Sequence, residues 1–167
     1  MARYIIGNGS QLSVKARSNV HDTVTVWNKV TGTLTADIET LSTAGASASA
    51  SVDMTDFDAG DWLKNRKLRK DYDMDAHPRA TFELTDLRNV VHHGQAFTAV
   101  AAGVLGWRGK QVNVTIAGKG TLTATTFDAT GAFELDIRTL GLQAPKVLMF
   151  KVQNEMSVEI TLRGVVQ

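Results

Sequence analysis

The sequence predicts an all-β fold in which short antiparallel strands surround one core. Apolar and polar residues alternate along most of the chain, which is the side-chain period of a strand with one buried and one solvated face. Turn-forming pairs with glycine, such as His93-Gly94 and Thr130-Gly131, separate these segments. Only one segment favours a helix. Because a barrel and a sandwich leave the same alternation, these observations alone leave both architectures open.

Composition limits the classes of function that the chain can serve. Of the 167 residues 43% are apolar and 21% are charged, which is ordinary for a globular protein and favours a single domain over residues 1–167. The formal net charge is +1, so no whole-protein field attracts nucleic acid or an anionic membrane. The absence of cysteine excludes disulfides, thiolate metal sites and cysteine nucleophiles.

The N-terminal segment has no continuous apolar stretch of signal-peptide length, because polar and turn residues occupy positions 7–11. No window approaches the roughly 18 consecutive apolar residues that a membrane span requires. The sequence therefore predicts a cytoplasmic protein with no stable membrane insertion.

The first quarter of the chain contains two predicted strands. In TVTVW, residues 23–27, Val24 and Val26 lie on one face and threonines on the other. In TLTADIE, residues 33–39, Leu34, Ala36 and Ile38 alternate with polar residues. We assign these apolar side chains to the inner face.

Two later strands carry small residues on the face that should be buried. Alanine packs little surface against its neighbours in a strand, so a run of inward alanines removes volume that a closed core would need. Either the interior is underfilled and suits an apolar guest, or the small residues let a helix or a neighbouring strand pack closely. The inward residues of these segments, 44–54 and 96–107, are Ala46, Ala48, Ala50, Val52 and Met54, and Ala99, Ala101 and Gly103.

The segment DWLKNRKLRK, residues 61–70, predicts a short helix over one end of the sheet. Acidic residues precede it and basic residues end it, which complements a helix dipole and favours a solvated face over the alternative, attraction of a lipid headgroup or another anion. The following Asp71, Asp73 and Asp75 are spaced like the first ligands of a calcium loop. Ala76 stands where that loop needs glycine, and Phe82 stands where it needs glutamate, so no calcium site is predicted.

The remaining strands follow Pro78, which favours the start of a strand. In each strand, apolar residues occupy every second position and are assigned to the inner face. They are Phe82 and Leu84; Val112, Val114 and Ile116; Phe133, Leu135 and Ile137; and Val158 and Ile160.

No motif for catalysis or metal binding stands out. His92 and His93 are adjacent, so in an extended chain they face opposite sides, and a zinc site needs convergent ligands. The chain has no G-x-S-x-G nucleophile turn, no complete dinucleotide fingerprint and no P-loop. We therefore expect neither an enzyme nor a metal site.

Three segments resemble the YceI-like family, also called the lipid- or polyisoprenoid-binding YceI domain. They are LKNRKLRKDYDMDAHPRATFELTDL, GVLGWRGKQVNVTIAG and LGLQAPKVLMFKVQNEMSVEITL. The first contains a basic helical segment, an acidic stretch and a proline that starts a strand with an inward Phe82. In the second, Gly103, Leu105 and Gly109 match a G-x-L-x-x-x-G hairpin element. The resemblance covers roughly Tyr4 to Leu162, although Tyr72 and His77 replace the aromatic residues that are usual before the proline.

The resemblance implies an antiparallel, lipocalin-like β-barrel of about eight strands with a short helix between strands. It also implies that the apolar interior holds a polyisoprenoid or an isoprenoid quinone. We expect non-catalytic binding, carriage or sequestration of such a lipid, with no cofactor required and no nucleic-acid partner. Trp62 and Trp107 are placed at the border of a mouth, because they lie near the helix and the hairpin.

The predicted ligand-binding residues are the inward ones of these strands. They are Val24, Val26, Leu34, Ala36, Ile38, Ala48, Ala50, Val52, Phe82, Leu84, Val112, Val114, Ile116, Phe133, Leu135, Ile137, Val158 and Ile160. The alternative is a β-barrel interaction module with a filled core that acts through its surface, as a monomer or as a homodimer. An enzyme that uses the interior as its pocket would need a polar or ionisable inward group, which this assignment does not provide.

Overall fold

The structure is a computed structural model that describes residues 1–144, 146–147 and 150–167. Pro145, Leu148 and Met149 of the third family-like segment lie outside the described residues. The strands are β1 (Ala2–Ile6), β2 (Gln11–Ala16), β3 (Thr23–Trp27), β4 (Val30–Ala36), β5 (Ser47–Asp53), β6 (Phe57–Asp58), β7 (Arg79–His93), β8 (Ala96–Trp107), β9 (Lys110–Leu122), β10 (Thr126–Asp136), β11 (Lys146–Val147), β12 (Phe150–Lys151) and β13 (Glu155–Val166). The helices are η1 (Ile38–Thr40), α1 (Leu41–Ala44), α2 (Trp62–Asp71) and η2 (Ile137–Leu140).

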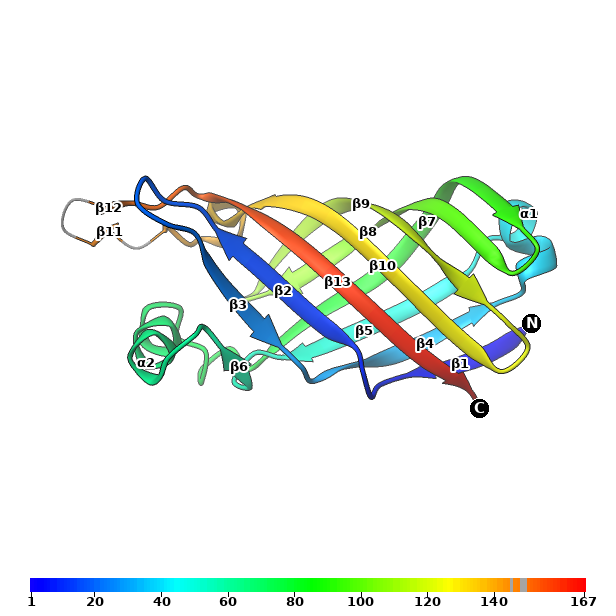
Figure 1. The fold of residues 1–167 in the computed structure, drawn as a ribbon, viewed down its shortest axis with the longest axis horizontal. Coiled ribbons are helices and arrows are strands. Elements are labelled where there is room, and N and C mark those ends of the chain that lie inside the picture. The colour runs from blue at the N-terminus through cyan, green and yellow to red at the C-terminus, as the bar shows by residue number, and fades with distance from the viewer. Residues whose placement is uncertain (145, 148–149) are drawn as a thin grey trace.

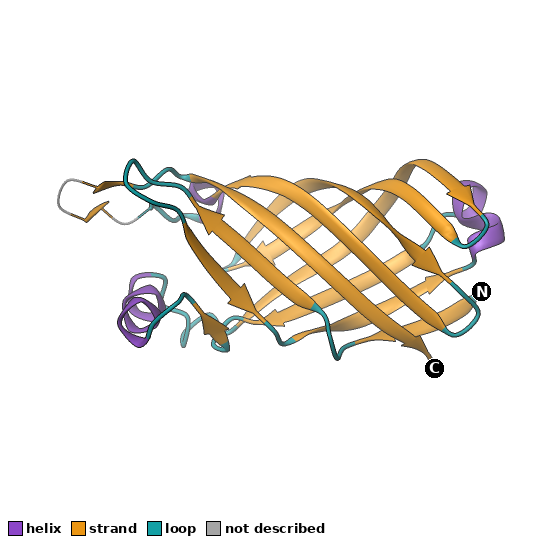
Figure 2. Ribbon diagram, in the orientation of Figure 1, coloured by secondary structure: helices purple, strands orange, loops and turns teal. Residues whose placement is uncertain are grey.

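The main sheet closes on itself, and Figures 1 and 2 show the strands wrapping around a long axis. The order β1-β4-β5-β7-β8-β9-β10-β13 returns to β1 through the antiparallel pairing of β1 with β13. This is a ring of eight strands, and β2, β3 and β6 extend it at one end. The prediction of an antiparallel barrel is therefore confirmed, and the sandwich is excluded.

Two chain segments share one place in the ring. β1 and β2 pair with successive parts of β13, in the registers Ile6 with Gly164 and Gln11 with Thr161. They form one strand that is interrupted by the turn at residues 7–10. The predicted strand count of about eight therefore agrees with the ring, although the structure divides the chain into more segments.

Not every ladder of the ring runs the full length of its strands. The ladder between β9 and β10 ends at the pair Ala117 and Ala132. β10 continues beside β13 as far as Asp136, and β9 continues beside β8 as far as Lys110. The short helix η2 contacts β9 in this region. The two strands thus separate toward the end of the barrel at which η2 lies.

The predicted helix is confirmed as α2, which lies at one end of the barrel (Figure 1). The Asp61 carboxylate caps it by accepting a 2.8 Å hydrogen bond from the Lys64 amide. The helix ends at Asp71, and the amide of the following Tyr72 still donates to the Leu68 carbonyl. α1 lies at the opposite end of the barrel, as do both chain termini.

Two aspartates near the end of α2 form ion pairs with the helix: Asp71, which is its last residue, and Asp75. Asp71 lies 3.0 Å from Lys67 Nζ, and Asp75 lies 2.8 Å from an Arg69 guanidinium nitrogen. In the part of the chain that the structure describes, no group of three or more His, Asp or Glu side chains could hold a metal ion.

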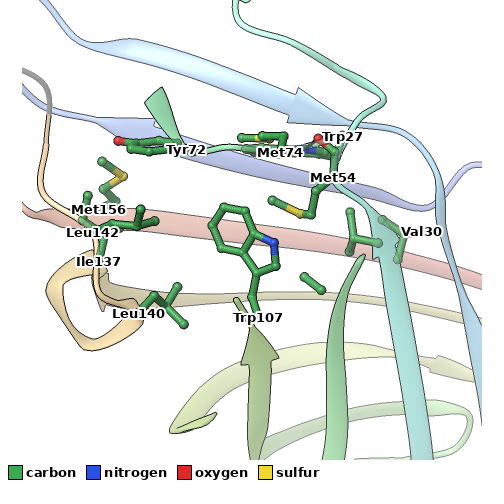
Figure 3. Packing of buried hydrophobic residues seen from close by; sticks show 12 residues of the cluster. Trp27, Val30, Met54, Tyr72, Met74, Trp107, Ile137, Leu140, Leu142 and Met156 are labelled. Atoms are coloured by element: carbon green, nitrogen blue, oxygen red, sulfur yellow. Dashed lines mark hydrogen bonds between the residues drawn. The ribbon is translucent and has the colours of Figure 1, made fainter. Parts of the chain in front are cut away.

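Buried side chains gather in two clusters, one at each end of the barrel. We name them the α2-end cluster and the α1-end cluster. The α2-end cluster, shown in Figure 3, contains Trp27, Val30, Val52, Met54, Tyr72, Met74, Ala80, Trp107, Ile137, Leu140, Leu142 and Met156. The α1-end cluster contains Tyr4, Ile6, Leu34, Ala36, Leu41, Leu122 and Phe127.

None of the helices among the described residues combines the length and the apolar character that crossing a bilayer requires.

Candidate functional site

An apolar cavity of about 210 Å³ lies inside the barrel. Its wall includes Val30, Val52 and Ala80 of the α2-end cluster and Leu41 and Phe127 of the α1-end cluster. The hollow therefore lies between the two packed ends of the barrel. The interior is not completely filled by the protein's own side chains.

A row of alanine and glycine residues across three adjacent strands leaves part of this space empty, and we name it the small-residue row. Ala99 of β8 pairs with Gly118 of β9, and Gly118 pairs with Gly131 of β10. All three residues line the cavity. Since inward residues of paired strands lie side by side, this row removes the volume of three side chains at one level of the barrel. Gly131 then pairs with Ile160 of β13, which ends the row.

Alanines of β5, and Ala46 just before it, add to the hollow. Ala46, Ala48 and Ala50 all line the cavity. Ala48 pairs with Leu34 and Ala50 pairs with Phe82, so each alanine has a large neighbour. The expectation that the inward alanines of residues 44–54 and 96–107 leave an underfilled interior agrees with this geometry.

Glycine also holds two large side chains against the wall. A Cβ atom at Gly103 would lie 2.3 Å from Phe82 Cζ, so the phenyl ring lies over the glycine. A Cβ atom at Gly131 would lie 2.7 Å from Ile116 Cγ2. The ring of Phe82 and the branch of Ile116 therefore occupy the space that a side chain at these positions would take.

The cavity wall presents almost no polar side chains. Thr81, Lys119 and Thr130 are its polar residues, and all three are exposed to solvent. Each follows or precedes an inward residue of its strand, so its side chain points to the outer face. A guest in the cavity would contact hydrocarbon and aromatic surface.

Many predicted ligand-binding residues line this cavity. They come from β4, β5, β7, β9, β10 and β13, and the structure brings them together on one wall. They are Leu34, Ala36, Ala48, Ala50, Val52, Phe82, Leu84, Ile116, Phe133 and Ile160. Contact of these residues with a ligand stays a prediction.

The assignment of Val24 and Val26 to the inner face is wrong. Thr25 and Trp27 of β3 are buried, with 7% and 4% of their surface exposed, whereas Val24 is 47% exposed. Side chains alternate along a strand, so burying Trp27 places both valines on the outer face.

The other predicted residues are inside the barrel but away from the cavity wall. Val114 and Val158 are buried, and Ile38 packs beside the α1-end cluster. Val112 and Leu135 pack against the α2-end cluster, of which Ile137 is a member. Ile38 and Ile137 also lie in the short helices η1 and η2 and not in strands, so their predicted strand assignment is wrong.

Sequence reasoning missed several large side chains of the wall. Phe97, Leu105, Leu122 and Phe127 line the cavity but were not assigned to it. The pair Thr130-Gly131 predicts a turn, yet Gly131 lies inside β10, as Gly118 lies inside β9. A glycine inside an alternating strand often marks a close approach of another group, and that is the signal that could have found them.

The α2-end cluster closes one end of the barrel with aromatic and methionine side chains. Trp107 is 8% exposed, and its indole N–H donates a 2.8 Å hydrogen bond to the His77 carbonyl. The Trp27 indole donates to the Met54 carbonyl at 3.3 Å. The predicted place of Trp107 at the border of a mouth is therefore wrong, because this residue is part of the packed end (Figure 3).

Buried phenols lie at both ends of the barrel. Burial raises the pKa of Tyr72 to about 12, and the neighbouring Asp71 carboxylate adds to the shift. Burial, and to a smaller extent Asp37, also raises the pKa of Tyr4, whose hydroxyl donates to the Thr123 carbonyl. Both phenols are therefore neutral at physiological pH.

A closed antiparallel barrel with an apolar interior defines the class of small β-barrels that can hold a guest. The model of the YceI-like domain matches residues 5–164. The chain therefore belongs to the YceI-like family, as the three sequence segments predicted. No match was found among curated proteins.

Solved structures share the fold. BcnA from Burkholderia cenocepacia has 21% identity and a TM-score of 0.75, with 92% of this chain and 95% of that chain covered. A polyisoprenoid binding domain from Saccharophagus degradans, implicated in plant cell wall breakdown, has 14% identity and a TM-score of 0.76 over 100% of this chain and 99% of that chain. A YCEI protein from Campylobacter jejuni has 9% identity and a TM-score of 0.67 over 90% and 85%.

Proposed function

We propose that the protein binds an isoprenoid-type lipid, a polyisoprenoid or an isoprenoid quinone, in the barrel cavity and carries or sequesters it unchanged. The observation that carries this proposal is the hollow between the two packed ends, whose wall is apolar. The membership in the YceI-like family and the similarity to a polyisoprenoid binding domain support it.

The hydrophobic effect supplies enough free energy for such binding. Each buried methylene contributes about 0.8 kcal/mol. Micromolar affinity corresponds to a binding free energy of about 8 kcal/mol. Burial must also offset the free-energy cost of ordering the ligand. A few isoprene units, with five carbons each, therefore suffice. Because the wall offers no specific polar contact, we expect weak discrimination between apolar chains.

The size of the cavity limits how much of the ligand it encloses. At about 210 Å³ it lies below the range of about 300–1,000 Å³ that is usual for pockets of drug-sized ligands. We therefore infer that the cavity holds a segment of a few isoprene units. A longer chain requires a change at one of the packed ends.

The chemistry of the wall favours binding over catalysis. Among the described residues, Lys119 is the one ionisable residue of the wall, and its side chain is on the outer face. General acid or base catalysis needs a positioned group within hydrogen-bonding reach of the reacting atoms. We therefore propose a non-catalytic role that requires no cofactor. The interaction module with a filled core is disfavoured by the cavity.

Ligand uptake after a cavity-filling substitution tests the proposal. Ala99→Phe adds a phenyl ring at the start of the small-residue row, so we expect binding of an added short-chain ubiquinone to fall by tenfold or more. The matched control is Ala117→Phe, because Ala117 is exposed on the neighbouring strand. Quinone bound to the purified protein is measured by equilibrium dialysis and absorbance.

The outcomes separate the alternatives. Retained quinone binding in wild type and in Ala117→Phe, together with its loss in Ala99→Phe, supports the cavity as the site. Equal binding by all three proteins places the quinone elsewhere. No uptake by wild type, and no lipid recovered from it by organic extraction and mass spectrometry, contradicts the proposal.

A further inference from the structure

The outward face of α2 combines apolar and basic side chains. Leu63, Arg66, Lys67 and Lys70 follow the spacing i, i+3, i+4, i+7, which places them on one face of a helix. All four are exposed, and Leu63 is 63% exposed. Trp62 begins the helix and is 71% exposed. Trp62 and Leu63 thus place two large exposed apolar side chains beside basic residues, a combination that suits contact with another surface.

The opposite face of α2 is fixed to the barrel. Asn65 accepts a 2.6 Å hydrogen bond from the Ala59 amide, and Leu68 packs against the α2-end cluster. Arg69 donates a 2.6 Å hydrogen bond to the Thr55 carbonyl. The helix is thus held in one orientation, and its exposed face is presented away from the barrel.

The charge on the exposed face is positive although the surrounding segment is balanced. Residues 58–75 contain five acidic residues (58, 61, 71, 73 and 75) and five basic residues (64, 66, 67, 69 and 70). The acidic ones lie before and after the helix or at its last residue, where Asp71 pairs with Lys67. Among the described residues, Arg66 and Lys70 make no ion pair.

The carboxylates at the start of the helix are engaged with backbone amides. Asp58 accepts from the Gly60 amide, and Asp61 accepts from the Lys64 amide, both at 2.8 Å. Neither is ion-paired with the basic residues of the exposed face. The net charge of +1 for the whole chain therefore conceals a local basic surface.

We propose that this surface of α2 docks on an anionic phospholipid bilayer. Tryptophan is enriched at the headgroup level, and lysine and arginine are attracted to anionic lipids. The inference rests on the proposed function, because an apolar ligand is most abundant in a bilayer and a carrier must collect it there. Tyr72 and Met74, directly after α2, belong to the α2-end cluster, so docking brings this packed end to the lipid surface.

Vesicle sedimentation tests the docking surface. Wild type is mixed with vesicles of phosphatidylglycerol and phosphatidylcholine, or of phosphatidylcholine alone. Each Lys or Arg near an anionic surface strengthens binding by about fivefold. We therefore expect Arg66→Glu/Lys70→Glu to reduce partitioning to the anionic vesicles by roughly 30-fold or more, and added salt to weaken wild-type binding.

The single variant Arg66→Glu should also lose about fivefold or more of this partitioning. Its matched control reverses one charge at the other end of the barrel. Arg3 is exposed on β1, and both chain termini lie there, opposite α2 (Figure 1). Arg3→Glu should leave partitioning within about twofold of wild type. An equal loss of vesicle partitioning in both variants would mean that net charge alone causes the effect, and it would overturn the assignment of the docking surface to α2.

Tryptophan quenching provides a readout that locates the contact. Trp27 and Trp107 are buried and Trp62 is exposed, so brominated lipids should quench Trp62 first. The quenching should be lost in Trp62→Phe. Quenching that persists in this variant, or none in wild type bound to vesicles, contradicts the proposal.

Failure of docking and failure of ligand binding are distinguishable. Quinone uptake from detergent solution needs no vesicle. Uptake without binding to anionic vesicles overturns the docking surface and leaves the proposed function intact. Salt-sensitive docking through α2 without any quinone uptake supports the surface and contradicts the proposed function.

Discussion

The middle and the α2 end of the barrel are built from the same alternating strands but are filled in opposite ways. The middle has alanine and glycine at neighbouring inward positions, and a cavity of about 210 Å³ lies there. The α2 end has Trp27, Trp107, Met54, Met74 and Met156 packed together. The difference teaches that strand alternation sets the inner face, whereas side-chain volume along the axis decides between packing and binding. Stability and binding should therefore respond to substitutions in different places.

Removal of the central indole of the packed end should have the largest effect on stability. Trp107→Ala should lower the free energy of unfolding by about 3–5 kcal/mol, because a large buried side chain leaves a void and the His77 carbonyl loses its donor. Urea unfolding followed by circular dichroism measures this. Trp62→Ala is the control, since Trp62 is 71% exposed and its loss should cost less than about 0.5 kcal/mol. Equal effects would refute the contrast between core and surface.

Alkaline pH should weaken the same end through Tyr72. The pKa of Tyr72 is raised to about 12 in the folded protein from 10.0. Its contribution to stability is therefore complete below pH 10 and is lost as the pH rises toward 12, by about 2–3 kcal/mol in total. Urea unfolding between pH 8 and pH 12 measures the loss. Tyr72→Phe should remove this part of the pH dependence, and an unchanged profile would contradict the role of Tyr72.

Overfilling at Gly103, beneath the Phe82 ring of the cavity wall, should cost less stability than emptying the packed end. In Gly103→Ala the new methyl group would meet the Phe82 ring at 2.3 Å and the Glu83 carbonyl at 2.5 Å. We expect a loss of about 1–3 kcal/mol of stability. We also expect weaker quinone binding, because the ring is displaced toward the cavity. Gly7→Ala is the control, since nothing lies within 4 Å of its Cβ position. Thermal unfolding compares the two variants.

A larger side chain in the hollow should have the smallest effect on stability. Ala48→Leu places an apolar side chain in empty space, so the free energy of unfolding should stay within about 1 kcal/mol of wild type while quinone binding falls. Ala132→Leu on the exposed face of β10 is the control for binding. A loss of stability above about 2 kcal/mol in Ala48→Leu would mean that the cavity has no room for it.

The fold could be predicted because the period of two persists through most strands and the family segments fix the order of the elements. Alternation predicts the inner face correctly in strands whose large apolar residues all lie on one face. The prediction of the inner face is wrong in β3, where apolar residues lie on both faces: Val24 and Val26 on one, and Trp27 beside Thr25 on the other. There the burial of one indole outweighs two valines.

Two other errors share one cause. Asp37 and Asp136 each follow a strand or end it, and each side chain accepts a 3.0 Å hydrogen bond from the amide two residues later. This caps a short 3-10 helix, so Ile38 and Ile137 leave the alternating pattern. The aspartate that follows the apolar residues of each strand is the sequence signal that could have predicted the start of the short helix.

Position along the barrel axis could not be predicted from alternation. Val112 and Ile116 lie on the same face of β9, yet Ile116 lines the cavity and Val112 packs against the α2-end cluster. The alternation gives the side of the sheet, and the depth depends on the shear of the whole barrel. The cytoplasmic location and the homodimer stay predictions.

The seam between β9 and β10 gives the barrel a compliant side. Beyond Ala117 and Ala132 the two strands share no ladder, so they can move apart there without breaking hydrogen bonds to each other. The ladder between β5 and β7 likewise ends at Ser49 and Glu83, although β7 continues to His93. Where the ladders are continuous, a change of girth would have to break them. The circumference is thus less constrained at these two places than along the continuous ladders.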